Sequence, residues 1–194
     1  MFHPIKHFKT ITYHRQLVCA HCIKAGIPLQ GLMHDLSKYS LTEFIPGARY
    51  YLGNKSPNVG EREKKGASYA WMHHKGRNKH HFEYWYDYCI KTRRAEAVRM
   101  PARYLIEMFC DRVAASKVYQ GANYSQDKPL AYFRDGHAKN FMHPETAQVL
   151  EQWLVMLAEE GEEATFAYIR SLHRHVYDSM LRKEDLHATQ TSRR

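Results

Sequence analysis

Residues 31–40 read GLMHDLSKYS and set an imidazole directly beside a carboxylate, at His34 and Asp35, in an apolar stretch. Lys38 follows one helical turn later. The apolar spacing predicts a helix at about 29–38, entered by a turn at Pro28. Polar groups of this kind are costly to bury unless they pair with one another or bind a cation. A metal site between packed helices would account for their position.

Outward from this stretch, the hydrophobic spacing is helical nearly throughout. It predicts helices over 5–25, 42–52, 67–75 and 80–92, then from Pro101 to about Gln120, from Pro144 to Gly161, and over 163–183. Residues 53–66, with glycines, a proline and dense charge, predict a loop, and 122–143 predict an irregular segment with a short helix near 129–134. No strand alternation and no internal repeat is evident. The pattern is typical of an all-α helical bundle.

The composition is that of a folded, basic chain. Hydrophobic residues make up 44% of it, and the formal net charge is +9. That charge favours anionic partners such as nucleotides, phosphate esters, nucleic acid or acidic lipid, or is simply a solvated surface. No apolar run is long enough to cross a bilayer, and the N-terminus MFHPIKHFKTITYH does not resemble a secretory signal. The expected location is the cytoplasm, where the four cysteines would be buried free thiols.

Histidine is unusually abundant in this chain, with 14 copies. Neutral imidazole is the commonest biological metal ligand near pH 7. Histidines and acids recur in order along the expected helices: His14, His34 with Asp35, then His73, His74, His80 and His81 in WMHHKGRNKHHFEYW, and finally Asp111 in an apolar helix. Ligands on successive helices converge only if the helices pack together, as they do in a bundle.

Each of these residues also has an ordinary structural interpretation. His34 would then be a core histidine bonded to a carbonyl, and Asp35 a helix cap or a partner of Lys38. The two His-His pairs would be a basic aromatic surface, and Asp111 would pair with a nearby arginine. The ordered recurrence of all of them together favours metal binding over these alternatives.

The ordered set resembles the HD-domain superfamily of metal-dependent phosphohydrolases, named for H…HD…D ligands on a helical core. The resemblance covers about residues 10–120 and rests on HRQLV from His14, HDLSK from His34, and the late Asp111. The stretches HDLSKYSLTEF, NKHHFEYW and EMFCDRVAAS are more closely similar to a small HD-like bacterial and phage family, a likeness that brings no reaction with it. The resemblance to the HD-domain superfamily implies one HD-like domain over 1–183. Its metal-site core would lie at about 10–120 and its C-terminal helices at 144–183, followed by a flexible tail at 184–194.

The resemblance also implies a ligand set. His14, His34, Asp35 and Asp111 would hold one cation. Asp35 would bridge to a second, held by one histidine of the 73/74 pair and one of the 80/81 pair. His21, one heptad after His14, is a rival for the first ligand. Mixed nitrogen and oxygen ligands suit Mn²⁺, Fe²⁺, Co²⁺, Zn²⁺ or Ni²⁺ better than Mg²⁺.

Asp35 and Lys38 would be the catalytic residues, with Lys38 neutralising phosphate charge, although Lys38 could equally be an ordinary surface lysine. Arg77, Asn78 and Lys79 could grip an anionic substrate. Glu43 and Glu107 are candidates for orienting the ligand histidines, and Glu107 could instead bind a cation directly.

The sequence therefore predicts a metal-dependent phosphohydrolase that acts on a nucleotide or another small phosphate ester. Two other classes stay open. One is an HD-type di-iron oxygenase with four histidines and two aspartates. The other is a non-enzymatic module that binds nucleic acid or protein through a basic helical face. Metal content and the response to chelators separate the three classes. No membrane partner is expected, and the oligomeric state is not indicated.

Overall fold

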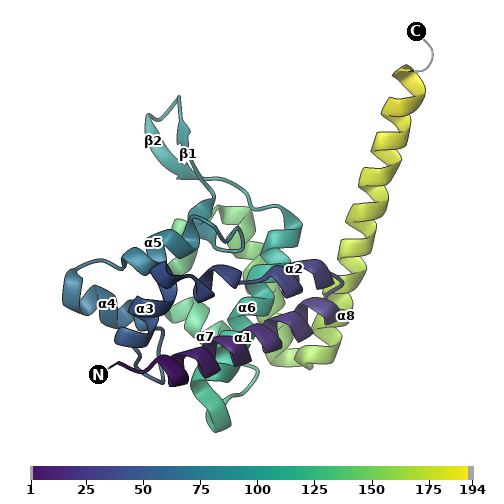
Figure 1. The fold of residues 1–194 in the computed structure, drawn as a ribbon. Helices are drawn as coiled ribbons and strands as arrows, with labels where there is room; N and C mark the ends of the chain where they lie inside the picture. Colours follow the sequence, from purple (N-terminus) through teal and green to yellow (C-terminus); the bar gives the residue numbers. More distant parts are fainter. Residues whose placement is uncertain (1, 192–194) are drawn as a thin grey trace.

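In the computed structural model, the backbone is described for residues 2–191 and the side chains for residues 2–172. The described chain is mostly helical, which confirms the expected all-α fold apart from one small hairpin (Figure 1). The helices are α1 Pro4–Lys24, α2 Pro28–Met33, α3 Leu41–Arg49, α4 Pro57–Lys65, α5 Tyr69–Lys75, α6 Ala102–Gln120, α7 Lys128–Asp135 and α8 Pro144–Thr191. None of these helices is both long enough and apolar enough to cross a membrane.

Helix α6 runs through the centre of the molecule, between α1 and α8 (Figure 1). Residues 105–110 are all buried, so this helix has neighbours on nearly every side. Phe109 is fully buried and meets Trp153 and Phe166 of α8 edge-on, with ring centroids 6.0 and 5.6 Å apart. Buried aromatic rings contribute most of the energy of such cores. Packing on nearly every side therefore fixes the position of α6 and of the side chains that it carries.

Helix α1 buries a stripe that alternates histidine with apolar residues. Its buried positions are His7, Ile11, His14, Val18, His21 and Cys22. The three- and four-residue steps put these side chains on one face of the helix. A Cβ atom at Gly31 of α2 would lie 2.6 Å from Cys22 Cβ, so α2 packs against α1 more closely than any larger residue would allow. This close approach sets the position of His34 and Asp35, which follow α2.

The segment expected to be a single helix at 29–38 is two elements. α2 ends at Met33, and a 3-10 helix, η1, spans Leu36–Tyr39. Asp35 lies between them with a φ of 53°, in the left-handed region. Aspartate tolerates this conformation better than most residues because its short polar side chain can bond locally. The break turns the His-Asp pair towards the interior.

Residues 53–66, expected to be a loop, contain helix α4. Ser56 Oγ accepts a hydrogen bond from the Asn58 amide at 3.4 Å, Pro57 is the first residue, and Gly66 ends the helix with a φ of 76°. Serine before the first turn, proline inside it and glycine after the last turn are ordinary helix boundary signals. The high charge of this segment belongs to an exposed helix face and not to a loop.

The prediction of a helix at 80–92 is also wrong. A 3-10 turn, η2 Phe82–Tyr84, leads into strands β1 Tyr86–Cys89 and β2 Arg94–Ala97, which pair antiparallel with Tyr86 opposite Ala97 and Cys89 opposite Arg94. The alternation of aromatic and polar residues over 86–89 has the period of a strand. The hairpin stands clear of the helical body (Figure 1).

The C-terminal half matches the expected elements closely. α6 follows Pro101 and ends at Gln120, and α7 occupies the short helix expected near 129–134. Short 3-10 helices η3 Gly121–Asn123 and η4 Ala138–Phe141 fill the rest of the irregular segment. α8 contains Gly161 with φ 88° and ψ 174°, which separates the two helices expected on either side. Residues 184–191 continue α8, and 192–194 lie outside the described residues.

Candidate metal centre

The His-Asp pair is held in place by Arg15 of α1. The Arg15 guanidinium donates hydrogen bonds to the carbonyl oxygens of His34, at 2.7 Å, and Leu32, at 2.9 Å. These carbonyls lie at the C-terminal end of α2, where backbone acceptors have no partner within the helix. His34 and Asp35 are 2% and 0% exposed. Arg15, which follows His14 in the sequence, therefore fixes the turn that carries His34 and Asp35.

The first group of candidate ligands joins α1, the His-Asp turn and α6. His14, His34, Asp35 and Asp111 each offer one ligand atom, and these atoms all lie within 4.8 Å of one another. His14 Nε2 lies 2.9 Å from Asp111 Oδ1, and His34 Nε2 lies 3.2 Å from Asp35 Oδ2. The sequence predicted this set, and the structure brings its members together.

The second group shares Asp35 with the first. Asp35, His74, His80 and His81 also offer ligand atoms within 4.8 Å of one another. His74 Nε2 and His80 Nε2 lie 3.2 and 3.5 Å from Asp35 Oδ1, the oxygen that faces away from the first group. The two oxygens of one fully buried carboxylate thus face two sets of nitrogen donors. Both members of the 80/81 pair, and only His74 of the 73/74 pair, belong to the group.

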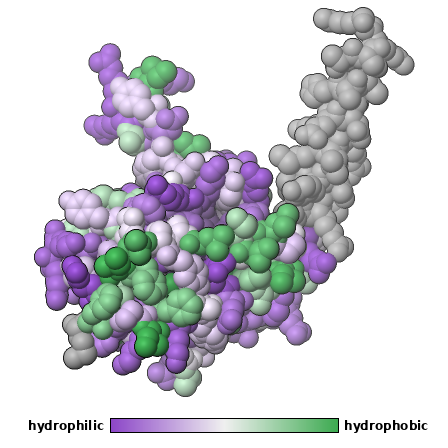
Figure 2. All heavy atoms as spheres, in the orientation of Figure 1, coloured by the Kyte–Doolittle hydropathy of each residue, from purple (hydrophilic) through white to green (hydrophobic). Residues whose placement is uncertain are grey.

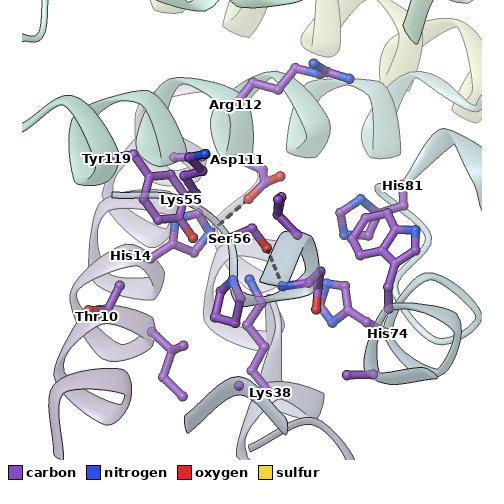
Figure 3. Close-up of a pocket in the computed structure, with 18 of the residues that line it drawn as sticks. Thr10, His14, Lys38, Lys55, Ser56, His74, His81, Asp111, Arg112 and Tyr119 are labelled. Carbon is purple, nitrogen blue, oxygen red and sulfur yellow. Dashed lines mark hydrogen bonds and ion pairs between the residues drawn. The ribbon is translucent and has the colours of Figure 1, made fainter. Parts of the chain in front are cut away.

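The ligand atoms of both groups face a common buried space. The Nε2 atoms of His14, His34, His74, His80 and His81 and both Asp35 oxygens are buried and make no well-aligned hydrogen bond within the described residues. The closest charged contacts among them are those of His14 Nε2 with Asp111 Oδ1, at 2.9 Å, and of Lys38 Nζ with Asp35 Oδ2, at 2.6 Å. Buried polar atoms without partners are rare in proteins and call for an explanation. In Figure 3, His14, His74, His81 and Asp111 surround this space from different elements.

Two glutamates hold the opposite nitrogens of the rings. Glu107 Oε1 lies 2.9 Å from His34 Nδ1 and 3.1 Å from His80 Nδ1. Glu43 Oε2 lies 2.7 Å from His74 Nδ1. A carboxylate on Nδ1 fixes the tautomer so that Nε2 presents its lone pair, as is usual for metal-binding histidines. This places Glu43 behind the ligands, as the sequence suggested. Glu107 lies behind His34 and His80 and also forms a third group of candidate ligands with them, so its direct binding of a cation stays open.

The protonation states follow from burial and from neighbouring charge. Burial and the Lys38 charge lower the pKa of His14, and burial with two neighbouring histidines lowers the pKa of His81 well below its ordinary value. Burial alone would raise the pKa of Asp35, but His34 and Lys38 hold it well below its usual range. Burial also opposes protonation of His34, yet the nearby carboxylates raise the pKa of its ring well above the ordinary value. The centre is thus built around ionised carboxylates that attract positive charge.

Lys38 occupies the side of Asp35 that faces a cavity. Its Nζ lies 2.6 Å from Asp35 Oδ2, three residues away in sequence. Burial would lower the pKa of Lys38, but the Asp35 and Asp111 carboxylates raise it, so the ammonium group is charged. The lysine is therefore a cation at the centre and not an ordinary surface residue.

Other predicted site residues lie elsewhere. His73 Nδ1 contacts Glu43 Oε1 at 2.7 Å, and its ring is outside both groups. His21, the rival first ligand, contacts the Cys110 carbonyl and stacks on Phe166. Asn78 donates to Ser37 Oγ and to the His74 carbonyl, each at 2.8 Å, and so supports the turn after α5. Arg77 and Lys79 are exposed and do not line the cavity.

A cavity of about 800 Å³ opens beside the centre. Its wall includes His14, His74, His81 and Asp111, together with four cationic side chains, Lys38, Lys55, Arg62 and Arg112. Lys55, Ser56 and Arg62 come from α4 and the turn before it, the segment expected from the sequence to be a loop. Figure 3 shows Lys55, Ser56 and Tyr119 near His14 and Asp111. The helix boundary signals at Ser56 and Pro57 could have revealed these residues.

Comparison with known proteins places the chain in a family. Residues 3–156 match the family model described as a family of unknown function, DUF5662. The chain belongs to DUF5662. The match extends from the start of α1 into α8, so the DUF5662 region contains both ligand groups, both glutamates and the cavity. No curated protein and no solved structure matches the chain. The likeness to the HD-domain superfamily stays a prediction.

Proposed function

We propose that this DUF5662 protein is a metal-dependent phosphohydrolase that acts on a small phosphate ester, such as a nucleotide, through a dinuclear His/Asp centre. The observation that carries the proposal is the convergence of buried imidazole nitrogens and carboxylate oxygens around Asp35, most of them without a hydrogen-bond partner among the described residues. Leaving that many polar atoms unpaired in the interior is costly. Two cations at this point would satisfy these atoms together.

The donor set fits divalent transition metals. The first position would be held by His14, His34, Asp35 and Asp111, and the second by Asp35, His74, His80 and His81. Mixed imidazole and carboxylate donors suit Mn²⁺, Fe²⁺, Co²⁺, Zn²⁺ or Ni²⁺ rather than Mg²⁺, which prefers oxygen ligands and retained water. The carboxylates on the Nδ1 atoms of three of these rings make the Nε2 atoms better donors.

The chain supplies the groups that phosphoryl chemistry requires next to this centre. A bound pair of divalent cations supplies Lewis acidity towards a phosphoryl oxygen. Lys38, on the cavity side of Asp35, binds and neutralises a phosphate oxygen. Lys55 and Arg62 add positive charge along the same wall, and they replace the exposed Arg77 and Lys79 in the substrate-binding role.

The size and lining of the cavity support a small organic phosphate. About 800 Å³ lies within the range of small-molecule sites. Trp71 and Tyr119 line it together with the cations. Aromatic side chains offer flat apolar contact to a planar group, while the cations attract the phosphate end. A substrate with both parts, such as a nucleotide, fits this lining.

The test is hydrolysis by purified protein loaded with Mn²⁺, Co²⁺ or Zn²⁺, against a panel of nucleotides and phosphodiesters, followed by phosphate release. We expect turnover that chelators abolish. Asp35→Asn keeps the left-handed turn, because asparagine tolerates it, but removes the charge shared by the two groups. We expect this variant to lose at least about a hundredfold in activity, the lower range for removal of a group that stabilises the transition state electrostatically.

The matched control is Asp135→Asn, which alters an exposed carboxylate at the end of α7. We expect it to be as active as the unmodified protein. Equal activity in Asp35→Asn and Asp135→Asn, or no turnover with any metal and any substrate on the panel, would count against the proposal.

A second candidate is a di-iron oxygenase, and the count of donors favours it. The two groups together contain five histidines and two aspartates, His14, His34, His74, His80, His81, Asp35 and Asp111. This is enough to supply the four histidines and two aspartates of that class. Two irons per chain, with an optical or EPR signal that changes on exposure to O₂, would favour oxidation over hydrolysis.

A further inference from the structure

The β1–β2 hairpin stands apart from the body and buries almost nothing. In both strands, the first three residues are exposed and only the last is half-buried. It is anchored at its base, where the Val98 amide donates to the Trp85 carbonyl at 2.8 Å and the Tyr86 hydroxyl contacts the Phe141 carbonyl. A lone two-stranded hairpin without a packed face is only marginally stable. The exposed surface of the hairpin is therefore free to contact a partner.

One face of the hairpin is aromatic and otherwise nearly bare. Residues opposite one another in an antiparallel pair point to the same side, so Tyr86 and Tyr88 share a face with Ala95 and Ala97. Tyr88 is 61% exposed. Because alanine covers little of a neighbouring ring, the flat side of Tyr88 is open to a planar ligand.

The end of the hairpin carries unpaired positive charge. Lys91, Arg93 and Arg94 are exposed, and none of them forms an ion pair with a described residue. Arg94 pairs with Cys89 and so lies on the face of Asp87 and Glu96, whereas Lys91 and Arg93 lie in the turn between the strands. The two acids of the hairpin are engaged locally: Glu96 accepts a hydrogen bond from Thr92 at 2.6 Å, and Asp87 accepts one from the Tyr88 amide at 2.8 Å. In Figure 2, hydrophilic residues cover much of the projecting hairpin.

Arg93 occupies a position that disfavours it. Its φ is 56°, in the left-handed region, and its amide donates to the Cys89 carbonyl at 2.8 Å to close the turn. Glycine or asparagine would take this conformation at little cost, whereas another residue costs about 1 kcal/mol or more. The strained position presents the charge of Arg93 at the tip of the hairpin.

We propose that the β1–β2 hairpin is an arm that binds single-stranded nucleic acid. Lys91 and Arg93 at the turn contact the phosphates, and Tyr88 stacks on a base. Cations beside an open aromatic ring are the combination with which proteins hold unpaired strands, since every base has a flat face and every nucleotide a charge. The inference is independent of the proposed hydrolysis, because it concerns binding by residues outside the metal centre and the cavity.

The test uses the full chain and a fluorescent single-stranded DNA of about 15 nucleotides, with the matching duplex for comparison. Anisotropy over a range of NaCl concentrations gives the dissociation constant and its salt slope. We expect salt-sensitive binding to the single strand. Combining Lys91→Ala with Arg93→Gly should reduce the slope of log K against log salt by about 1.4, at about 0.7 for each phosphate that the variant no longer neutralises. Tyr88→Leu should weaken binding at least about fivefold without changing the slope.

Arg93→Gly separates binding from folding. Glycine relieves the left-handed backbone, so this variant should unfold at the same or a higher urea concentration and still bind more weakly than the unmodified protein. The matched control is Lys9→Ala, an exposed cation on α1 far from the hairpin (Figure 1). It should leave the dissociation constant and the slope unchanged.

Three outcomes would overturn the proposal. The first is an equal dissociation constant and slope in the double variant and in Lys9→Ala. The second is a dissociation constant for the duplex equal to that for the single strand, which would indicate that the hairpin binds a groove of double-stranded DNA. The third is a change only in molecular mass by light scattering, which would make the hairpin a contact between protein chains.

Discussion

At the scale of single residues, two neighbouring histidines on one short helix have different surroundings. His73 and His74 both contact Glu43, through its two separate oxygens. Only His74 Nε2 reaches the space around Asp35. Neighbouring positions on a helix point about 100° apart, so the two rings cannot share one centre. The pair is therefore a natural comparison between a ligand and a non-ligand that share an anchoring carboxylate.

We expect His74→Gln to lose one of two cations per chain and His73→Gln to retain both. The reason is that only the first substitution removes a nitrogen donor of the second group. Elemental analysis of the purified variants, after loading with Mn²⁺ or Zn²⁺ and desalting, measures this directly. Equal metal content in the two variants would mean that His74 is not a ligand.

His21 gives a pH dependence that is separate from the metal centre. Its Nδ1 must donate to the Cys110 carbonyl, at 3.2 Å, so its Nε2 can only accept from Lys117 Nζ, at 3.1 Å. The ring is therefore neutral, and burial, together with the Lys117 charge, lowers its pKa from 6.5 to about 4. In the unfolded chain the ring takes up a proton near the ordinary value. Stability is thus lost as the pH falls from about 6.5 towards 4, because the unfolded state binds the extra proton.

His21→Gln should reduce this acid sensitivity. In metal-free protein, the free energy of unfolding in urea should fall between about pH 7.5 and about pH 4.5 by on the order of 2 kcal/mol less in the variant than in the unmodified chain. The variant has a lower stability at neutral pH because it loses the stacking on Phe166, so the quantity to compare is the difference between the two pH values. The same pH difference in both proteins would contradict the assignment.

The sequence predicted the types of ligand better than the individual ligands. His34, Asp35 and Asp111 could be named, because acids and imidazoles in apolar stretches are conspicuous. It could not decide between His14 and His21, which lie one heptad apart on the same face of α1. Which of the two histidines reaches the centre depends on the point along α1 at which the His34–Asp35 turn crosses this helix. That point is set by the close approach of Gly31 to α1. Nor did it identify Lys55 and Arg62, because their segment resembles a loop.

At the scale of elements, local boundary signals and core packing explain which predictions held. α6 was predicted almost to the residue, since proline precedes it, glycine follows it and apolar residues fill it. The hairpin was missed because it has no buried face and because its aromatic–polar alternation covers only the four residues of β1. α4 was missed for the related reason that its charged, exposed residues resemble a loop when the capping residues are overlooked.

The packing of α3 on α1 depends on the absence of a side chain at Gly47. A Cβ atom there would lie 2.2 Å from His7 Nε2. Alanine inside a helix normally stabilises by about 0.5–1 kcal/mol relative to glycine. We expect Gly47→Ala instead to lower the free energy of unfolding by about 1–3 kcal/mol, the usual cost of overpacking.

The control for this prediction is the same substitution in a His7→Ala background, where the imidazole no longer fills the space. There Gly47→Ala should become neutral or stabilising in urea titrations. If Gly47→Ala has the same cost in both backgrounds, the close approach of His7 is not its cause.

At the scale of the whole molecule, the core and the candidate centre are built on the same helices. α1 and α6 carry Val18, Phe109 and Val113 in the core and also His14 and Asp111 in the first ligand group. A cation that binds only the folded arrangement stabilises the entire chain by mass action. Global stability should therefore respond to metal.

Removing metal with a chelator should lower the midpoint of thermal unfolding by about 5–10 °C. Saturation at about a hundred times the dissociation constant contributes about 2.7 kcal/mol, and each kcal/mol moves the midpoint of a chain of this size by about 2–4 °C. Calorimetry with and without chelator, followed by addition of Mn²⁺ or Zn²⁺, measures the shift and its reversal. Asp35→Asn should show no shift. A shift of the same size in that variant would place the stabilising cation at another site.

Glu107 joins parts of the chain that are far apart in sequence. It lies 73 residues from His34 and reaches His80 with the same oxygen. Contacts of such long sequence separation form late, because the intervening chain must first be ordered. During refolding, helical circular dichroism should therefore recover before the protein regains its capacity to take up metal. A newly made chain would pass through an interval in which it is already compact but cannot yet bind a cation.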